Sequence, residues 1–548
     1  MPDAPLAPPE HFRGVFRLDA DARAVYSEAA GIAQIMPRAV AVPAHADDVA
    51  ALVRWAAREQ VPLVPRGSGS SMAGGAIGDG VIVDLSRLRG LEPVDVGHRT
   101  IRCAPGTLRD EVDAAARAAG LQFPVDPSSG AYCTVGGMAS TNSAGAHTLR
   151  YGAMRDWVEA LDCVFADGSR AEVRRGAPAP AVPAVQRFLA GANALVAAEH
   201  AAPSHHPDVR KESSGYGLWS WAQSGELVDL LVGSEGTLAL IVGLELRLAP
   251  LRPASASVLG VFASLEQAVD AAVGAREGGA AACELLDRTF LDVARQGGAS
   301  TIGEEAEAVL LAEVEGEDDA DCAAQARALE RGFRAAGATE VTLALDPATE
   351  HAMWELRHAA SPILGRLDPA LKSMQFIEDG CVPPARLAEY VRGVRAALGR
   401  QGIRGVIFGH AGDAHMHVNP LVDVRDPAWR DKADALLAEV TGLAARLGGT
   451  VAGEHGDGRL RAPLLAQLWS AATLERFAAV KRAFDPHGLL NPGAKVPAAG
   501  ARAIEAVKYD PALAPLPAAA RAVLARVERD RAYARSRLDL LDAATGAA

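Results

Sequence analysis

The chain has 548 residues, of which 68 are Asp or Glu and 55 are Lys or Arg, so its formal net charge is −13. This acidic balance argues against nucleic acid as the main partner, because phosphate binding requires clustered positive charge. The six cysteines are scattered without a C-x-x-C pair, which excludes an iron–sulfur ligand run or a zinc ribbon in this sequence and does not indicate a disulfide framework.

The length predicts two or three domains, and 49% hydrophobic with 22% charged residues is typical of a globular protein. The first residues, MPDAPLAPPEHF, lack the basic and apolar regions of a signal peptide. No window of about 18 residues is uniformly apolar, so we expect no transmembrane helix. Together with unpaired cysteines, these features predict a cytoplasmic protein.

Residues 1–36 are expected to be an irregular lead-in, and apolar residues at helical spacing predict a helix over 46–59. A short apolar strand, a loop dense in Gly and Ser, and a second strand at 81–85 follow. Such a loop exposes backbone N–H groups that can hold a pyrophosphate. Its glycines do not match the Rossmann spacing, and an ordinary glycine-rich turn is an equal alternative.

The next segment is expected to contain a hairpin that turns at Gly97-His98 and a helix near 108–119. A second region of small residues, DPSSGAYCTVGGMASTNSAGAH, begins at Asp126 and cannot build a core. Close backbone approach to a ligand is its expected use. The stretch 176–184 is predicted to be a Pro/Ala linker, and 230–248 a loop that closes into a buried strand.

After Pro250 the pattern becomes one of strands and helices of modest length. Strands are predicted at 256–262, 309–315 and 339–345, and helices at 264–276, 318–336 and 384–399. This order indicates an α+β domain.

The segment 405–420, GVIFGHAGDAHMHVNP, is predicted to be two strands around a Gly412-Asp413 turn. His410 would then face His415, with His417 two positions further on the same face. Together with the pair Glu454-His455, these imidazoles would suit zinc or a similar divalent ion. Hydrogen-bonded histidines in turns are the alternative.

The C-terminal tail is predicted to have a Pro-rich hinge and then an Arg-rich helix over about 518–541. A charged helix packed on the surface or frayed is the favoured interpretation. The alternative is that the helix docks on an acidic partner or at the inner face of an anionic membrane.

Six ordered motifs, PRGSGSSMAGG, TVGGMASTNSAG, VGSEGTL, GHAGDAHMH, GEHG and FDPHGLLNPG, resemble the FAD-linked oxidase family with a vanillyl-alcohol-oxidase type of flavin domain. The resemblance covers roughly residues 37–497 and is strongest to the D-lactate and D-2-hydroxyglutarate dehydrogenases and the glycolate oxidase flavin subunit. It implies an α+β fold with an FAD-binding domain over 37–250, an antiparallel-sheet cap over 251–450 that binds substrate, and a return to the flavin domain over 451–497. Residues 1–36 and 498–548 would be the lead-in and the tail.

The resemblance implies that the first Gly/Ser loop holds the FAD pyrophosphate and that later small residues line the rest of the cofactor. The implied residues are Arg66, Gly67, Ser68, Gly69, Ser70, Ser71, Pro127, Ser128, Thr134, Gly136, Gly137, Asn142, Gly145, Glu235, Gly236, Ile241 and Asn491. Because Ser70 and Ser71 stand where some relatives carry a flavin-linked histidine, we expect non-covalent FAD.

For the substrate, the resemblance implies a carboxylate site of Arg357, Ser361 and Lys372, which Asn419 would support. His410, His417 and Glu454 would be the metal ligands, and His455 the general base. The sequence departs from the commoner family form at Ala414 and His415. His415 is therefore expected either to support the site or to replace a ligand.

The expected function is that of an FAD-dependent D-2-hydroxyacid dehydrogenase of the D-lactate dehydrogenase kind. Alternatives are a D-2-hydroxyglutarate dehydrogenase, a glycolate oxidase flavin subunit, an alkyl-dihydroxyacetone-phosphate-synthase-like transferase, and a subunit that acts only within an electron-transfer complex. Nothing resembles a nicotinamide site, so the electrons would pass to a quinone, a cytochrome, an electron-transfer flavoprotein or an iron–sulfur subunit. A homodimer is one of the oligomeric states left open.

Overall fold

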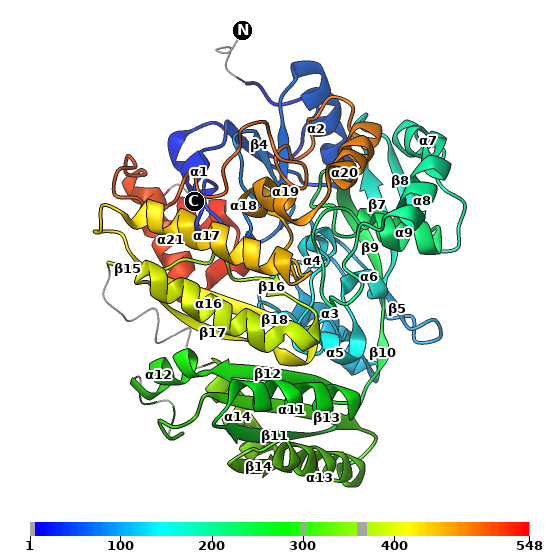
Figure 1. The fold of residues 1–548 in the computed structure, drawn as a ribbon. Helices are drawn as coiled ribbons and strands as arrows, with labels where there is room; N and C mark the ends of the chain where they lie inside the picture. Colours follow the sequence, from blue (N-terminus) through cyan, green and yellow to red (C-terminus); the bar gives the residue numbers. More distant parts are fainter. Residues whose placement is uncertain (1–5, 297, 299, 301, 359–369, 547–548) are drawn as a thin grey trace.

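The structure is a computed structural model that describes residues 6–546 apart from 297, 299, 301 and 359–369. Two smaller sheets form the N-terminal part, and one large sheet forms a separate layer beside them (Figure 1).

The first sheet has the order β1-β2-β4-β3, with β2, β4 and β3 parallel and β1 antiparallel to β2. Its strands are β1 (Val15–Arg17), β2 (Ala39–Val42), β3 (Leu63–Arg66) and β4 (Val81–Asp84). Alternate residues of these strands face opposite sides, as a pleated strand requires. One face packs against α2 (Ala46–Glu59) and the other against α1 (Ala20–Val25) and the C-terminal helices. The predicted helix over 46–59 and the predicted strands around the Gly/Ser loop are confirmed.

The expectation of an irregular lead-in over 1–36 is wrong for residues 15–25, since β1 and α1 lie there. A three-residue strand and a six-residue helix are too short to display a hydrophobic period.

The second sheet is antiparallel with the order β5-β9-β7-β8. Its strands are β5 (Thr100–Cys103), β7 (Val158–Val164), β8 (Arg170–Arg174) and β9 (Leu240–Arg247), and the short β6 (Leu121–Gln122) and β10 (Ala249–Pro250) pair beside it. The predicted turn at Gly97-His98 is confirmed by the pairing of Asp95 with Thr100. Surrounding helices are α3 (Arg109–Ala118), α4 (Val135–Thr141), α5 (Thr148–Tyr151), α6 (Met154–Trp157), α7 (Pro183–Ala190), α8 (Ala192–Ala201), α9 (Leu218–Ser224) and α10 (Leu227–Leu231).

The cap is an eight-stranded antiparallel sheet in the order β14-β11-β13-β12-β17-β18-β15, with β16 also paired to β18. Its strands are β11 (Ala254–Phe262), β12 (Ala282–Asp287), β13 (Ala308–Gly316), β14 (Glu340–Ala344), β15 (Leu371–Ser373), β16 (Gly380–Cys381), β17 (Arg404–His410) and β18 (His415–Asp423). Its helices are α11 (Leu265–Glu277), α12 (Arg288–Gln296), α13 (Asp319–Ala335), α14 (Pro347–His358), α16 (Leu387–Gln401) and α17 (Trp429–Arg446). The strands and helices predicted after Pro250 are confirmed.

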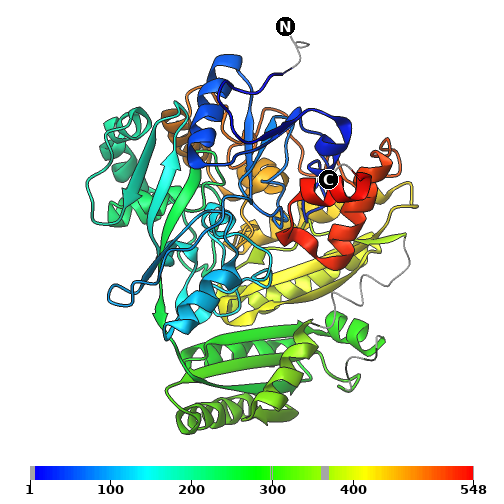
Figure 2. The ribbon, with the colours of Figure 1, turned by 180° about the vertical axis from the view of Figure 1, so that it is seen from behind.

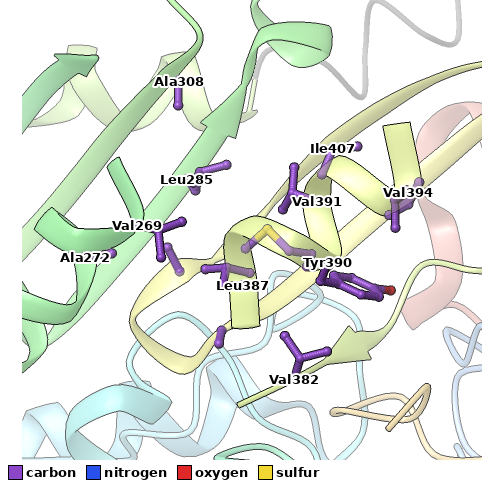
Figure 3. Close-up of a cluster of buried hydrophobic side chains, with 14 of the residues drawn as sticks. Val269, Ala272, Leu285, Ala308, Val382, Leu387, Tyr390, Val391, Val394 and Ile407 are labelled. Carbon is purple, nitrogen blue, oxygen red and sulfur yellow. The ribbon is translucent and has the colours of Figure 1, made fainter. Parts of the chain in front are cut away.

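One face of the cap sheet forms a continuous apolar core with α11, α13, α16 and α17. Figure 3 shows part of it, where Leu285 of β12 and Ile407 of β17 lie near Val391 of α16. The polar residues Glu284 of β12, Glu313 of β13 and His410 of β17 occupy the alternate positions of these cap strands. The period of two therefore places polar side chains together on the opposite face of the sheet.

After the cap, the chain returns to the N-terminal part through α18 (Gly458–Arg461), α19 (Leu465–Leu468) and α20 (Ala471–Phe484). Phe477, Val480 and Phe484 of α20 join the core of the second sheet, and Leu490 pairs with Leu63 of β3.

The tail forms two helices, α21 (Ala518–Asp530) and α22 (Arg537–Thr545), so the prediction of one helix over 518–541 is wrong. The break falls at Arg531, whose φ of 50° ends α21 in the left-handed conformation. Both helices pack against α1 (Figure 2), and among the described helices none is long and apolar enough to cross a bilayer.

Candidate active site

A cavity of about 1,810 Å³ lies between the polar face of the cap sheet and the small-residue loops of the N-terminal part. Fifteen of the residues expected to hold FAD line it: Arg66, Gly67, Ser68, Gly69, Ser70, Ser71, Pro127, Ser128, Thr134, Gly136, Gly137, Gly145, Glu235, Gly236 and Ile241. The structure therefore brings the separate Gly/Ser-rich stretches to one wall.

The two Gly-rich loops pack too closely for larger residues. A Cβ atom on Gly67 would lie 2.2 Å from Oγ1 of Thr134, and one on Gly136 would lie 2.6 Å from Cβ of Pro105. Thr134 caps α4 by accepting a hydrogen bond from the N–H of Gly137. The wall is thus built largely from backbone, which suits a phosphate-bearing cofactor.

Asn142 and Asn491 are not among the described residues that line the cavity. Asn142 accepts a 2.9 Å hydrogen bond from the N–H of Arg155, and Asn491 donates to the carbonyl oxygens of Gly75 and Glu235. Both side chains hold the cofactor loops in place instead of facing their occupant.

The predicted pairing of His410 with His415 is confirmed, and a single 3₁₀ turn over Ala411–Asp413 connects the two strands. His417 lies on the same face and meets His410, with 3.4 Å between their Nε2 atoms. Glu454 completes the group, because its Oε1 lies 3.6 Å from His410 Nε2 and 3.4 Å from His417 Nε2.

The tautomers of both histidines are set by their partners. His410 donates Nδ1–H to the carboxylate of Glu284, and His417 donates Nδ1–H to the carbonyl oxygen of Glu378 at 2.9 Å. When both rings are neutral, each therefore directs an Nε2 lone pair toward the same point. Burial, followed by the neighbouring histidines, holds the pKa of His417 well below its usual range, so this ring is neutral.

This group fits a small divalent cation. Donor atoms placed tetrahedrally at zinc–ligand distances of 2.0–2.1 Å would be about 3.3 Å apart. The three distances between His410 Nε2, His417 Nε2 and Glu454 Oε1 are 3.4, 3.4 and 3.6 Å. Two nitrogens, one carboxylate oxygen and a free fourth position form the donor set of a catalytic zinc site.

Lys211 fixes the orientation of Glu454. Its fully buried ammonium lies 3.1 Å from Glu454 Oε2, which leaves Oε1 to face the histidines. Burial opposes ionisation of Glu454, but Lys211 and His410 outweigh it and hold the pKa of Glu454 well below its usual range. The carboxylate of Glu454 is therefore ionised before any ion binds.

His415 lies on the other side of this carboxylate, with Nδ1 3.9 Å from Glu454 Oε2. Its Nε2–H donates to Asp379 at 2.9 Å, while Nδ1 is buried and has no hydrogen-bond partner among the described residues. His415 thus supports the site, and its Nδ1 is also near enough to the other donor atoms to bind a cation with them.

Arg357 and His410 share one buried carboxylate. Arg357 Nε donates to Glu284 Oε2 at 2.7 Å, and its guanidinium stacks 4.6 Å from the ring of Phe408. Burial raises the pKa of Glu284, but His410 and Arg357 outweigh it and lower that pKa well below its usual range. Arg357, Lys372 and Asn419 all line the cavity, whereas Ser361 lies outside the described residues.

His455 faces the same centre, with Nε2 3.5 Å from Glu454 Oε1. Its Nδ1 lies 3.2 Å from Glu378 Oε1, and its backbone N–H donates to the carboxylate of Asp379. Burial lowers the pKa of His455, but the charges of Asp379 and Glu378 raise it to about 9. Without a neighbouring cation, His455 is therefore an imidazolium at neutral pH.

Glu284, Lys211, Glu378 and Asp379 were not found from the sequence, although each of them orients a predicted site residue. The available signal was a charged residue inside a buried apolar segment, as in the strand ACELLD of β12. Such residues are rarely buried without a partner, and here the partners are the site residues themselves.

Comparison with known proteins was consistent with this geometry. Residues 37–174 match the family model described as "FAD binding domain", and residues 251–494 match "FAD linked oxidases, C-terminal domain". The chain is 31% identical over 470 residues to a D-lactate dehydrogenase from Archaeoglobus fulgidus, covering 84% of this chain and 92% of the relative. It is 29% identical over 476 residues to the glycolate oxidase subunit GlcD of Bacillus subtilis, covering 86% and 92%. A D-2-hydroxyglutarate dehydrogenase from Pseudomonas putida is 29% identical over 512 residues, which cover 88% of this chain but 50% of that protein.

The fold also resembles that of solved structures. A 4-ethylphenol oxidase from Gulosibacter chungangensis superimposes with a TM-score of 0.64 at 16% identity, covering 88% of this chain and 94% of that one. An alkyldihydroxyacetonephosphate synthase superimposes with a TM-score of 0.60 at 15% identity, covering 87% and 82%. At these identities the likeness shows the fold alone.

The fold and the loop-lined cavity thus define a flavoprotein with a vanillyl-alcohol-oxidase type of FAD domain and an α+β cap. The chain belongs to the FAD-linked oxidase family, and its cofactor is FAD.

Proposed function

We propose that this protein is an FAD-dependent D-2-hydroxyacid dehydrogenase of the D-lactate dehydrogenase type. The observation that carries the proposal is the triangle of His410, His417 and Glu454 on the cavity wall, with Arg357 and His455 beside it. Three groups around one space match the parts of a 2-hydroxycarboxylate. The cation site would bind its hydroxyl, the guanidinium its carboxylate, and the imidazole would take the proton to be removed.

The chain's own residues would bind and orient the acid. Arg357 presents a planar donor pair for the carboxylate, and Glu284 and Phe408 hold that guanidinium in one plane. Lys372 adds a positive charge at the cavity wall, and Asn419 adds an amide. Fixing both ends of the acid in this way places its α-carbon in one orientation and lowers the entropic part of the barrier.

His455 would accept the hydroxyl proton at Nε2, the ring atom that faces Glu454. Glu378, next to Nδ1, would stabilise the imidazolium that forms. Bound FAD supplies the acceptor for the hydride, and a divalent cation, which the donor set suggests is zinc, would lower the pKa of the substrate hydroxyl. A cation bound at Glu454 would repel a proton on His455 and so lower the pKa of that imidazole. With the cation in place, His455 would therefore be neutral before substrate binds.

The experiment is anaerobic mixing of the FAD-loaded protein with a panel of 2-hydroxy acids: D-lactate, L-lactate, D-2-hydroxyglutarate and glycolate. We expect the flavin absorbance to bleach with D-acids and not with L-lactate, and the panel also separates the D-2-hydroxyglutarate dehydrogenase and glycolate oxidase alternatives. Absence of bleaching by every acid in a metal-replete sample would reject the proposal in favour of the transferase or assembly-subunit alternative. A quinone, a cytochrome, an electron-transfer flavoprotein or an iron–sulfur subunit would reoxidise the flavin.

Chelation followed by dialysis tests the metal separately. We expect bleaching to stop while FAD stays bound, and to return when zinc or another divalent ion is restored. Full activity in a sample shown to be free of metal would rule the cation out and leave the FAD-linked oxidation standing.

A further inference from the structure

Residues 498–548 lie beyond the family models, which end at residue 494, yet the tail is a layer of the flavin domain. Val40, Val64 and Ile82 of the first sheet face away from α2 and are buried against α1, α21 and α22. The apolar residues of the tail that cover this face are Ala520, Val523, Val527, Leu538, Leu540 and Leu541. The strands covered by the tail are those that carry the Gly/Ser loop between Arg66 and Val81.

The turn between the two tail helices projects into the cavity wall. Arg531 reverses the chain there, and Arg531 and Tyr533 line the cavity together with Tyr132 and Ser68. The rings of Tyr533 and Tyr132 lie 5.5 Å apart at 32°. Tyr132 lies within the second small-residue region, which begins at Asp126, so an aromatic pair from the tail and the flavin domain borders the cofactor part of the cavity.

Arg537 joins the tail to the Gly/Ser loop directly. Its guanidinium is 5.1 Å from the ring of Tyr533, and Nη2 donates to the carbonyl oxygen of Ser68 at 3.4 Å. Arg537 is 3% exposed and Arg66 is 2% exposed, and Arg537 Nε and Arg66 Nη2 have no hydrogen-bond partner among the described residues. Two buried guanidinium groups beneath one loop create a positive potential that suits an anion such as a pyrophosphate on that loop.

We propose that the tail is part of the FAD site: Tyr533 contacts the bound cofactor, and Arg537 is a positioning residue that holds the Gly/Ser loop in its FAD-binding form. The inference rests on FAD occupying the cavity beside this loop. It extends the cofactor site to a segment that the family models do not describe.

The test measures FAD affinity by titrating the apoprotein and following the quenching of flavin fluorescence. Loss of an aromatic contact or of a buried charge-assisted hydrogen bond is expected to weaken FAD binding about tenfold or more in Tyr533→Ala and Arg537→Gln. Tyr533→Phe keeps the ring and should bind FAD like the wild type. Arg521→Ala removes an exposed arginine from the neighbouring tail helix α21 and is the control. Wild-type affinity in both Tyr533→Ala and Arg537→Gln would overturn the proposal.

Amide hydrogen exchange of the wild-type protein provides a measurement that does not depend on the folding of variants. Adding FAD to the apoprotein should slow exchange over residues 530–538 and leave the exposed hairpin at 95–100 unchanged. Equal exchange of the turn in both forms would also overturn the proposal. The result is separate from the proposed activity, because FAD affinity and amide exchange are both measured without substrate. Failure of the proposed function would leave wild-type FAD binding intact and bleaching absent.

Discussion

His410 and His417 direct their Nε2 atoms toward each other across 3.4 Å, and each is held in that position by a hydrogen bond from its Nδ1–H. Two lone pairs that face each other repel unless a proton or a cation lies between them. The oxygen of Glu454 completes a triangle of nearly equal sides, so the arrangement has the size and charge of a divalent cation site.

Replacing His417 with alanine should therefore remove the metal but not the flavin. We expect His417→Ala to lose bound divalent metal, measured by elemental mass spectrometry, and to keep FAD, because His417 lies on the cap and not on the Gly-rich loops. Flavin bleaching by substrate should slow by at least about 100-fold. His98→Ala, the same substitution at an exposed hairpin histidine, is the control. Stoichiometric metal in His417→Ala would contradict the ligand assignment.

Glu284 contacts both His410 of the proposed cation site and Arg357 of the proposed carboxylate site, so one substitution there should impair both. In Glu284→Gln an amide nitrogen must face either Arg357 or His410, and both of these are donors. We expect metal affinity to fall about 10- to 100-fold and KM for the acid to rise. Glu277→Gln, at an exposed position of α11, is the control. Arg357→Lys should raise KM for the acid without loss of metal. A Glu284→Gln variant with wild-type KM and wild-type metal content would show that Glu284 does not couple the two sites.

The His455→Ala variant should retain FAD and metal but reduce the flavin at least about 100-fold more slowly. A base must be neutral to accept a proton, and Asp379 and Glu378 raise the pKa of His455 to about 9 in the absence of a cation. The wild-type reduction rate should therefore rise with pH until His455 is deprotonated, with the midpoint below 9 when the metal is bound. Stopped-flow measurements from pH 6 to 9 check this. Unchanged bleaching, or an unchanged pH profile, in His455→Ala would reject His455 as the base.

The sequence was sufficient for those parts of the site that depend on local spacing. The period of two in β18 placed His415 and His417 on one face, and the turn at Gly412-Asp413 set the pairing with His410. Small residues at 66–71 and 127–145 indicated a wall of backbone, which the cavity confirms.

The supporting residues could not be found in this way because their contacts join distant segments. Glu284 meets His410 across 126 residues, and Lys211 meets Glu454 across 243. The local sequence does not show that the side chain of Asn142 accepts a hydrogen bond from the backbone of Arg155, whereas Ser128 lines the cavity. The two tail helices were predicted as one because a left-handed residue such as Arg531 leaves no composition signal unless it is Gly or Asn.

The contact between the flavin domain and the cap should weaken as the pH rises, because His147 joins them. Its Nδ1 lies 2.6 Å from Asp126 and its Nε2 lies 2.8 Å from Glu313 of β13, while Arg150 and Tyr151 bind Glu315 on the same strand. Burial lowers the pKa of His147, but Asp126 and Glu313 outweigh it and raise that pKa well above 6.5. The stabilisation is fully present below the unfolded-state pKa of about 6.5 and is lost as the pH rises through the folded-state value.

Burial also raises the pKa of Glu313, and this carboxyl likewise destabilises the folded state as the pH rises above its unfolded-state pKa. At pH 6.5 we expect His147→Gln to lower the free energy of unfolding by about 2 kcal/mol. The difference from the wild type should shrink toward pH 9, because the wild-type imidazolium loses its proton and the glutamine has none to lose. Denaturant unfolding at several pH values measures this, with His200→Gln at an exposed position of α8 as the control. A difference that stays constant or grows with pH would show that His147 does not bind the two carboxylates as an imidazolium.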